Sequence, residues 1–185
     1  LLDHIVPLGT RGNLREVPAG PPATLGITGH ECFIGGTGRI LFSAGWVRSS
    51  EYDWRHDPRH PQGNLFTARP GDPAPVVFEA PRHTFNHISA SRCGRYFVAD
   101  SHTGAGLFEN GVSKPVALVV GNLASGKFRT LVQDTGGVGG GNQCTHTHPY
   151  LTADNRHVIY NANPHGGVPQ VYAARLAPGF LESLD

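Results

Sequence analysis

The chain lacks methionine entirely, carries little charge and contains no long hydrophobic run. Only 16% of its 185 residues are charged and the net charge is +1, so the composition indicates neither a polyanion partner nor a membrane surface. No apolar stretch approaches the ~20 residues needed to span a membrane, and no signal peptide is visible. The absence of methionine, even at position 1, predicts a fragment whose N-terminal part is missing.

Cysteine is also scarce. The three cysteines are widely spaced and form no C-x-x-C pair, so the sequence supports neither a zinc knuckle nor a disulfide framework; they are Cys32, Cys93 and Cys144. Such cysteine usage favours a protein of a reducing compartment. The 11 histidines are therefore the residues to search for metal-binding or acid–base chemistry.

Helical periodicity is nearly absent, apart from one terminal turn expected at 180–184. With 25 glycines and 15 prolines, the sequence favours many short strands joined by turns. A pattern recurs: a histidine, then Gly-Arg or Asn-Arg beginning seven or eight positions later, then an apolar strand. It begins at His30, His87 and His148. The Gly or Asn of each pair suits a hairpin turn, because both residues tolerate positive φ.

Further strands are expected after each hairpin, at 64–68, 76–78, 116–120, 128–132 and 170–176, and strands that close an earlier unit at 5–8 and 13–17. The units repeat after 57 and 61 residues. A repeat of short antiparallel strands with this period predicts an all-β fold, a β-propeller. Residues 1–185 would form one partial propeller domain of about three and a half blades.

The densest group of candidate ligands is Gln143, His146 and His148. Imidazole nitrogens and an amide oxygen suit a divalent transition metal such as Mn, Fe or Zn. In an extended segment, His146 and His148 would point to one face, because side chains alternate. The repeat also gives His30, His87 and His148 equivalent positions, where they could face one site or instead hydrogen-bond neighbouring blades.

Four segments together resemble one known family, the oligogalacturonate lyases, over essentially the whole chain. They are Gly29-His30-Glu31, Phe85-Asn86-His87-Ile88-Ser89, Gln143-x-x-His146-x-His148-Pro149 and Gln170-Val171-Tyr172. The resemblance implies the C-terminal half of a seven-bladed propeller and a cytoplasmic enzyme of pectin breakdown. It implies a manganese-type ion held by His87, Gln143, His146 and His148, with His30 as catalytic base. The family's assisting arginine has no convincing counterpart, although Arg11 and Arg15 are nearby.

The reaction implied is β-elimination in a short acidic oligosaccharide such as unsaturated digalacturonate, with no nucleic-acid or membrane partner. A metal would stabilise the charge that develops when the C5 proton is removed, and a neutral imidazole is a suitable base at neutral pH.

Two alternatives stay open: a non-catalytic propeller scaffold of the periplasmic TolB-like kind, and a cupin-type metal enzyme. The cupin pattern expects a glutamate after the second histidine, and 149–155 contains none. Asp100-Ser101-His102 follows the His87 hairpin and could line the channel, although we favour a strand-terminating turn.

Overall fold

The computed structural model describes residues 3–5, 15–18, 30–43, 63–81, 83–102, 108–109, 112–113, 116–136, 146–165 and 168–185. These residues are all-β, apart from one short 3-10 helix, η3 (Glu182–Leu184), at the expected terminal turn. Within the described ranges, no helix is long and apolar enough to cross a membrane.

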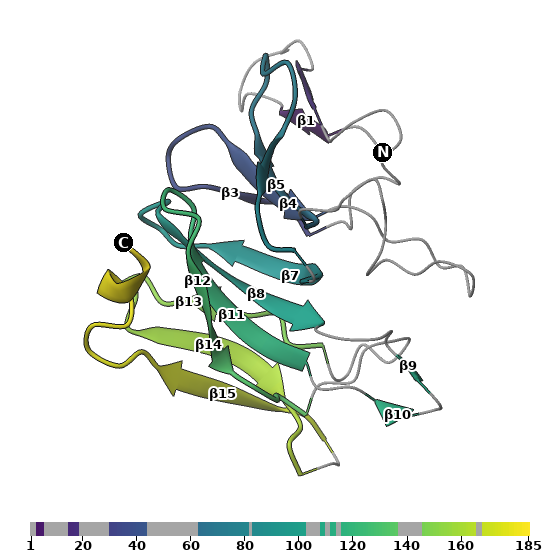
Figure 1. Ribbon diagram of the computed structural model, residues 1–185, viewed down its shortest axis with the longest axis vertical. Helices are drawn as coiled ribbons and strands as arrows, with labels where there is room; N and C mark the ends of the chain where they lie inside the picture. The colour runs from purple at the N-terminus through teal and green to yellow at the C-terminus, as the bar shows by residue number, and fades with distance from the viewer. Residues whose placement is uncertain are drawn as a thin grey trace.

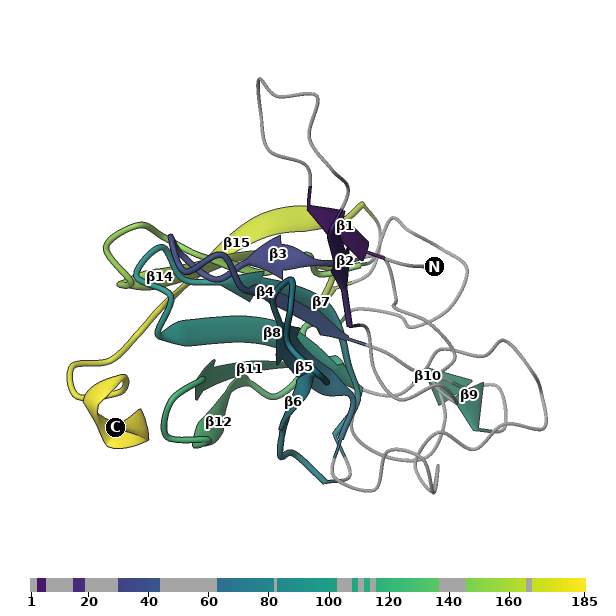
Figure 2. The same cartoon turned by 90° about the horizontal axis from the view of Figure 1, so that it is seen from above.

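Three antiparallel sheets dominate the fold, stacked in chain order (Figures 1 and 2). The first sheet contains β3 (Cys32–Phe33), β4 (Ile40–Ser43), β5 (Leu65–Ala68) and β6 (Val76–Phe78). The central sheet contains β7 (Phe85–Ala90), β8 (Tyr96–His102), β11 (Val116–Asn122) and β12 (Phe128–Val132). The third sheet contains β13 (Tyr150–Leu151), β14 (His157–Ala162) and β15 (Gln170–Arg175). The strands expected after each hairpin are therefore confirmed.

Two small strand pairs lie beside these sheets. β1 (Asp3–Ile5) pairs with β2 (Arg15–Val17), near the segments where closing strands were expected. β9 (Phe108–Glu109) pairs with β10 (Val112–Ser113), and the sequence pattern did not indicate this pair. The described strands do not close into a ring.

Each sheet begins with the hairpin that the repeat predicted. The turn residues have positive φ in all three: 70° at Gly38, 72° at Gly94 and 55° at Asn155. Only glycine and, less readily, asparagine adopt this left-handed region without a large steric penalty. The Gly or Asn before each arginine is therefore explained by turn geometry.

The sheets are held together by apolar side chains that alternate along the strands. In β8, Phe97 and Ala99 point toward the first sheet, while Tyr96 and Val98 point toward the third. All four are buried, so the central sheet is covered on both faces and reads in sequence as a continuous apolar run. Burial of this kind contributes roughly 25 cal/mol per Å² of apolar surface.

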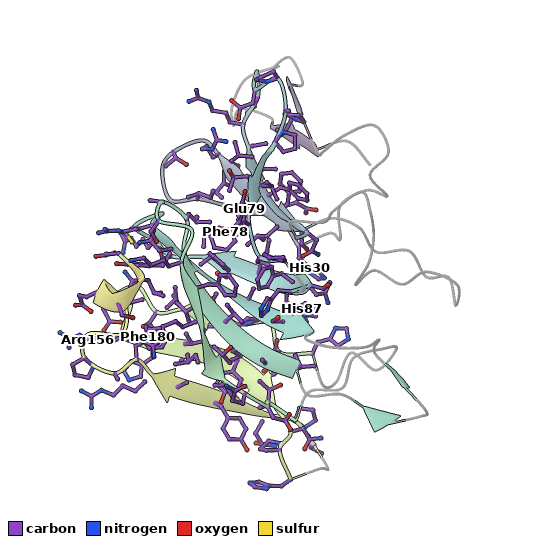
Figure 3. All side chains as sticks on the ribbon, viewed as in Figure 1. His30, Phe78, Glu79, His87, Arg156 and Phe180 are labelled. Carbon is purple, nitrogen blue, oxygen red and sulfur yellow. The ribbon has the colours of Figure 1, made fainter. Side chains whose placement is uncertain are left out.

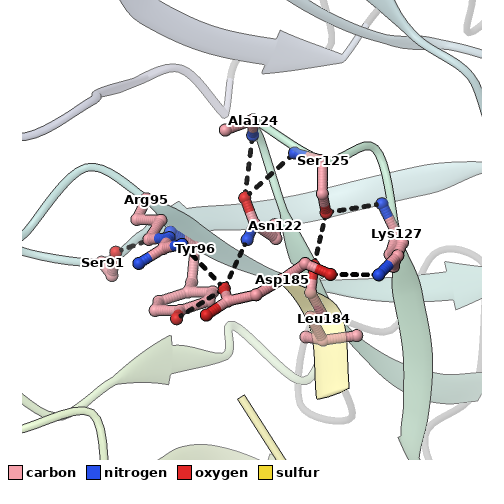
Figure 4. A network of polar contacts seen from close by, with 9 residues as sticks. All are labelled: Ser91, Arg95, Tyr96, Asn122, Ala124, Ser125, Lys127, Leu184 and Asp185. Atoms are coloured by element: carbon pink, nitrogen blue, oxygen red, sulfur yellow. Dashed lines mark hydrogen bonds and ion pairs between the residues drawn. The ribbon is translucent and has the colours of Figure 1, made fainter. Parts of the chain in front are cut away.

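The end of the described chain is fastened to the central sheet by polar contacts (Figure 4). Asp185 Oδ1 lies 3.0 Å from Asn122 Nδ2 and 3.0 Å from an Arg95 guanidinium nitrogen. The Tyr96 hydroxyl donates to the same oxygen at 3.3 Å. These contacts hold η3 in place, and Leu184 is buried between the central and third sheets.

Candidate metal centre

Four imidazole rings meet where the three sheets come together. Ring nitrogens of His87, His146 and His148 all lie within 4.8 Å of one another. His30 stands beside them, with its ring centroid 4.4 Å from that of His87 and 6.1 Å from that of His148. Figure 3 shows His30 and His87 next to each other beside β7. The structure thus brings together all four histidines that the sequence singled out.

Each sheet supplies its histidine from, or immediately before, its first strand. His30 precedes β3, His87 lies within β7, and His146 and His148 precede β13. Because β3 and β13 both contact β7, these strand starts converge. The histidines occupy equivalent positions in the repeat, and stacking the sheets brings these positions together, as the sequence suggested.

A β-bulge aims His87 into the cluster. Phe85 pairs with Ser101 and Ile88 with Ala99, so the two residues between Phe85 and Ile88 face one residue, Asp100, on β8. Bulges re-aim side chains in this way near functional sites. His87 is 3% exposed, and its Nε2 is buried without a hydrogen-bond partner.

A divalent ion fits this arrangement. A buried polar atom without a partner costs about 1–3 kcal/mol, and coordination would satisfy the His87 Nε2. Three convergent imidazole nitrogens suit a transition metal such as Fe or Zn rather than Ca or Mg, which prefer oxygen ligands. His146 is half-buried and His148 exposed, so the cluster is open on one side.

The segment carrying His146 and His148 is not a strand, contrary to the expectation of an extended His-x-His. Strand β13 begins only at Tyr150, and His148 has φ 40° and precedes Pro149. A residue before proline is ordinarily extended, so His148 occupies an unfavourable backbone conformation. Strain of this kind is typical of functional sites. The ring centroids of His146 and His148 lie 6.0 Å apart.

The environment disfavours the protonated form of two of the rings, His30 and His148. Burial, together with repulsion from the His87 and His148 imidazoles, lowers the pKa of His30 from 6.5 to about 4. Burial and the neighbouring His87 and His146 also lower the pKa of His148. At neutral pH these nitrogens keep free lone pairs, as both a ligand and a general base require.

Asp100 and Thr147 belong to the site although the sequence pattern did not select them. The expectation of a strand-terminating turn at Asp100-Ser101-His102 is wrong, because all three residues lie within β8. Asp100 is 1% exposed and contacts His87 and Thr147. An acid directly after the apolar run 96–99 was the available signal, since a carboxylate in a buried strand requires partners.

Gln143, the fourth ligand that the resemblance implies, lies outside the described residues. Of the two arginines near the expected position of the assisting arginine, Arg11 also lies outside them, and Arg15 is described only through its backbone in β2.

Comparisons with known proteins bear on the fold. No family model matches the chain, and no curated protein matches it by sequence. Among solved structures, the crystal structure of an oligogalacturonate lyase from Vibrio parahaemolyticus superposes with a TM-score of 0.60 at 19% identity. The match covers 91% of this chain but 40% of that protein, so this chain spans less than half the length of the enzyme that it resembles. The described sheets thus share the fold of part of that lyase.

Proposed function

We propose that this chain is part of a metal-dependent lyase that cleaves short oligogalacturonates by β-elimination. The observation that carries the proposal is the convergence of four imidazoles, three of them within 4.8 Å, on a sheet arrangement similar to that of an oligogalacturonate lyase. The three sheets would be successive blades of a β-propeller, with residues 1–185 as one part of it.

In this proposal, His87, His146 and His148 hold the ion, and Gln143 completes the ligand set. Mn²⁺ is the expected ion because the family that the sequence resembles uses a manganese-type ion, and the imidazole nitrogens are ligands for divalent transition metals in general. When bound, a divalent ion supplies a Lewis acid for the uronate carboxylate.

His30 is the proposed catalytic base. Its neutral ring takes the C5 proton, the electron pair forms the C4–C5 double bond, and the glycosidic oxygen leaves C4 with its bonding electrons and takes a proton from water. The low pKa ensures that His30 is unprotonated at neutral pH but also makes it a weak base. An anionic substrate would raise that pKa, because nearby carboxylates stabilise the imidazolium.

The protein should act in the cytoplasm on small acidic saccharides, without nucleic-acid or membrane partners. This part of the proposal rests on the sequence resemblance and on the nearly neutral composition.

The direct test is incubation of the Mn²⁺-loaded protein with digalacturonate and with its unsaturated form, followed by mass spectrometry of the products. Elimination splits the substrate without adding water, whereas a hydrolase adds one water to the product pair. We expect elimination products from the wild type and none from His30→Ala. His165→Ala is the matched control, since His165 is exposed and has no part in the proposed site. Retention of an ion without turnover refutes the lyase assignment, and absence of any ion favours a propeller scaffold.

A further inference from the structure

Asp100 makes contacts with two separate parts of the proposed metal centre. Its Oδ1 accepts the backbone N–H of His87 at 2.9 Å, and its Oδ2 lies 2.5 Å from His87 Nδ1. The Thr147 hydroxyl donates to the same Oδ2 at 2.8 Å. Asp100 and Thr147 are each 1% exposed, so water does not compete for these bonds.

The β-bulge explains why a carboxylate is needed here. Opposite the bulge, the His87 N–H has the Asp100 side chain as its acceptor instead of a carbonyl of the β8 ladder. A buried backbone donor requires some acceptor. The carboxylate therefore stabilises the irregularity that turns His87 toward the other imidazoles.

The same carboxylate fixes the proton on the His87 ring. An ionised carboxylate only accepts hydrogen bonds, so Nδ1 must donate and Nε2 keeps its lone pair. Asn86 Nδ2 also lies 3.3 Å from Nδ1. A protonated Nδ1 cannot accept a hydrogen bond from Asn86. Because the contact from Nδ1 to Asp100 is 2.5 Å and that to Asn86 is 3.3 Å, the carboxylate determines the tautomer.

The hydrogen bond from Thr147 connects Asp100 to the third sheet as well. Thr147 lies between His146 and His148, and its carbonyl accepts the N–H of Asn161 in β14 at 2.8 Å. One buried carboxylate thus joins β7, β8 and the segment before β13, which together carry three of the four imidazoles.

We propose that Asp100 is a positioning residue of the metal centre: it presents His87 as a ligand through Nε2 and, through Thr147, sets the place of His146 and His148. This inference rests on the metal centre of the proposed function. Carboxylates that orient ligating histidines typically contribute 10–100-fold to metal affinity or activity.

The test uses Asp100→Asn, which has nearly the same shape. The amide oxygen can still accept from the His87 backbone, which leaves the NH₂ group facing Nδ1. That group donates, so the ring proton should move to Nε2 and block the ligand nitrogen. We expect ¹⁵N NMR of the metal-free proteins to show Nδ1–H in the wild type and Nε2–H in Asp100→Asn. Titration with Mn²⁺ should show an affinity about 10–100-fold lower in the variant.

Threonine variants supply the matched comparison. Thr147→Val removes one bond to Asp100, so it should weaken Mn²⁺ binding by less than Asp100→Asn while His87 keeps Nδ1–H. Thr135→Val is the control, because Thr135 is also 1% exposed and bonds to the Val116 carbonyl rather than to Asp100. It should leave both readouts unchanged.

The outcomes separate the two ideas. Wild-type Mn²⁺ binding with unchanged affinity or unchanged tautomer in Asp100→Asn overturns the role of Asp100 and leaves the lyase proposal standing. A wild type that binds no Mn²⁺ overturns the metal centre itself. Should Asp100→Asn fail to fold, two other results decide: an Nε2–H tautomer in the wild type, or equal Mn²⁺ affinity of Thr147→Val and Thr135→Val, overturns the inference.

Discussion

Phe97 of β8 lies directly across the ladder from Gly121 of β11, and its ring occupies the space that a side chain at position 121 would need. A Cβ added to Gly121 would lie 2.3 Å from Phe97 Cε1 and 3.1 Å from Phe128 Cβ. Phe97 is fully buried between the first and central sheets, so its ring has little room to move.

Gly121→Ala should therefore lower the free energy of unfolding by about 1–3 kcal/mol, the usual cost of overpacking a core. Urea denaturation followed by circular dichroism would measure it. Gly36→Ala is the control, because a Cβ there meets nothing within 4 Å and φ is not positive. Equal stabilities of the two variants would contradict the packing described.

Removal of a ligand should weaken metal binding. His87→Ala and His146→Ala each leave only two imidazoles beside Gln143 in the proposed ligand set, so the bound metal should fall well below the about one ion per chain expected of the wild type. Elemental analysis after dialysis against Mn²⁺ measures the content. His165→Ala should retain the wild-type content, and an undiminished metal content in His87→Ala would rule out the proposed ligand set.

The His30 pKa has a consequence for pH dependence. In metal-free protein the folded-state pKa is about 4, below the ordinary 6.5. Between these values the unfolded chain binds more protons than the folded one, so stability falls as pH drops from 6.5 toward 4. NMR titration of the His30 ring protons in chelator-treated protein should give a midpoint near 4. A midpoint near 6.5 would contradict the burial and repulsion described.

The two described cysteines should differ in reactivity. Cys93 is exposed; burial raises its pKa, but hydrogen bonds, chiefly from the Ser91 hydroxyl and the backbone N–H of Arg95, lower it overall. Burial raises the pKa of Cys32, which is only partly exposed. Because the thiolate is the nucleophile, iodoacetamide should alkylate Cys93 faster than Cys32 at mildly alkaline pH. Peptide mass spectrometry over time measures both rates, and a faster Cys32 would contradict the prediction.

Sequence patterns predicted the features that depend on local chemistry. Gly38, Gly94 and Asn155 marked the turns because their positive φ restricts residue type. The strands of 116–120 and 128–132 followed from their apolar runs, and the matching spacing of His30, His87 and His148 led to the site.

Features that depend on pairing between strands could not be read from the sequence. The bulge before Ile88 and the partnership of Asp100 with His87 arise from the register of β7 on β8. The left-handed φ of His148 is equally hidden, since local preference before Pro149 favours an extended residue. The weak apolar content of β9 and β10 gave no signal for that pair.

The proposed ligands come from more than one sheet, and this division would link metal capture to folding. His87 lies in the central sheet and His146 precedes the first strand of the third, 59 positions later in the chain, so an ion held by both would act as a reversible cross-link between distant segments. Such a site cannot exist before the sheets dock, and the ion stabilises only the docked state. At a free concentration 100 times the dissociation constant, that linkage adds about 2.7 kcal/mol. The thermal midpoint of unfolding should accordingly rise with metal concentration and report directly on sheet assembly.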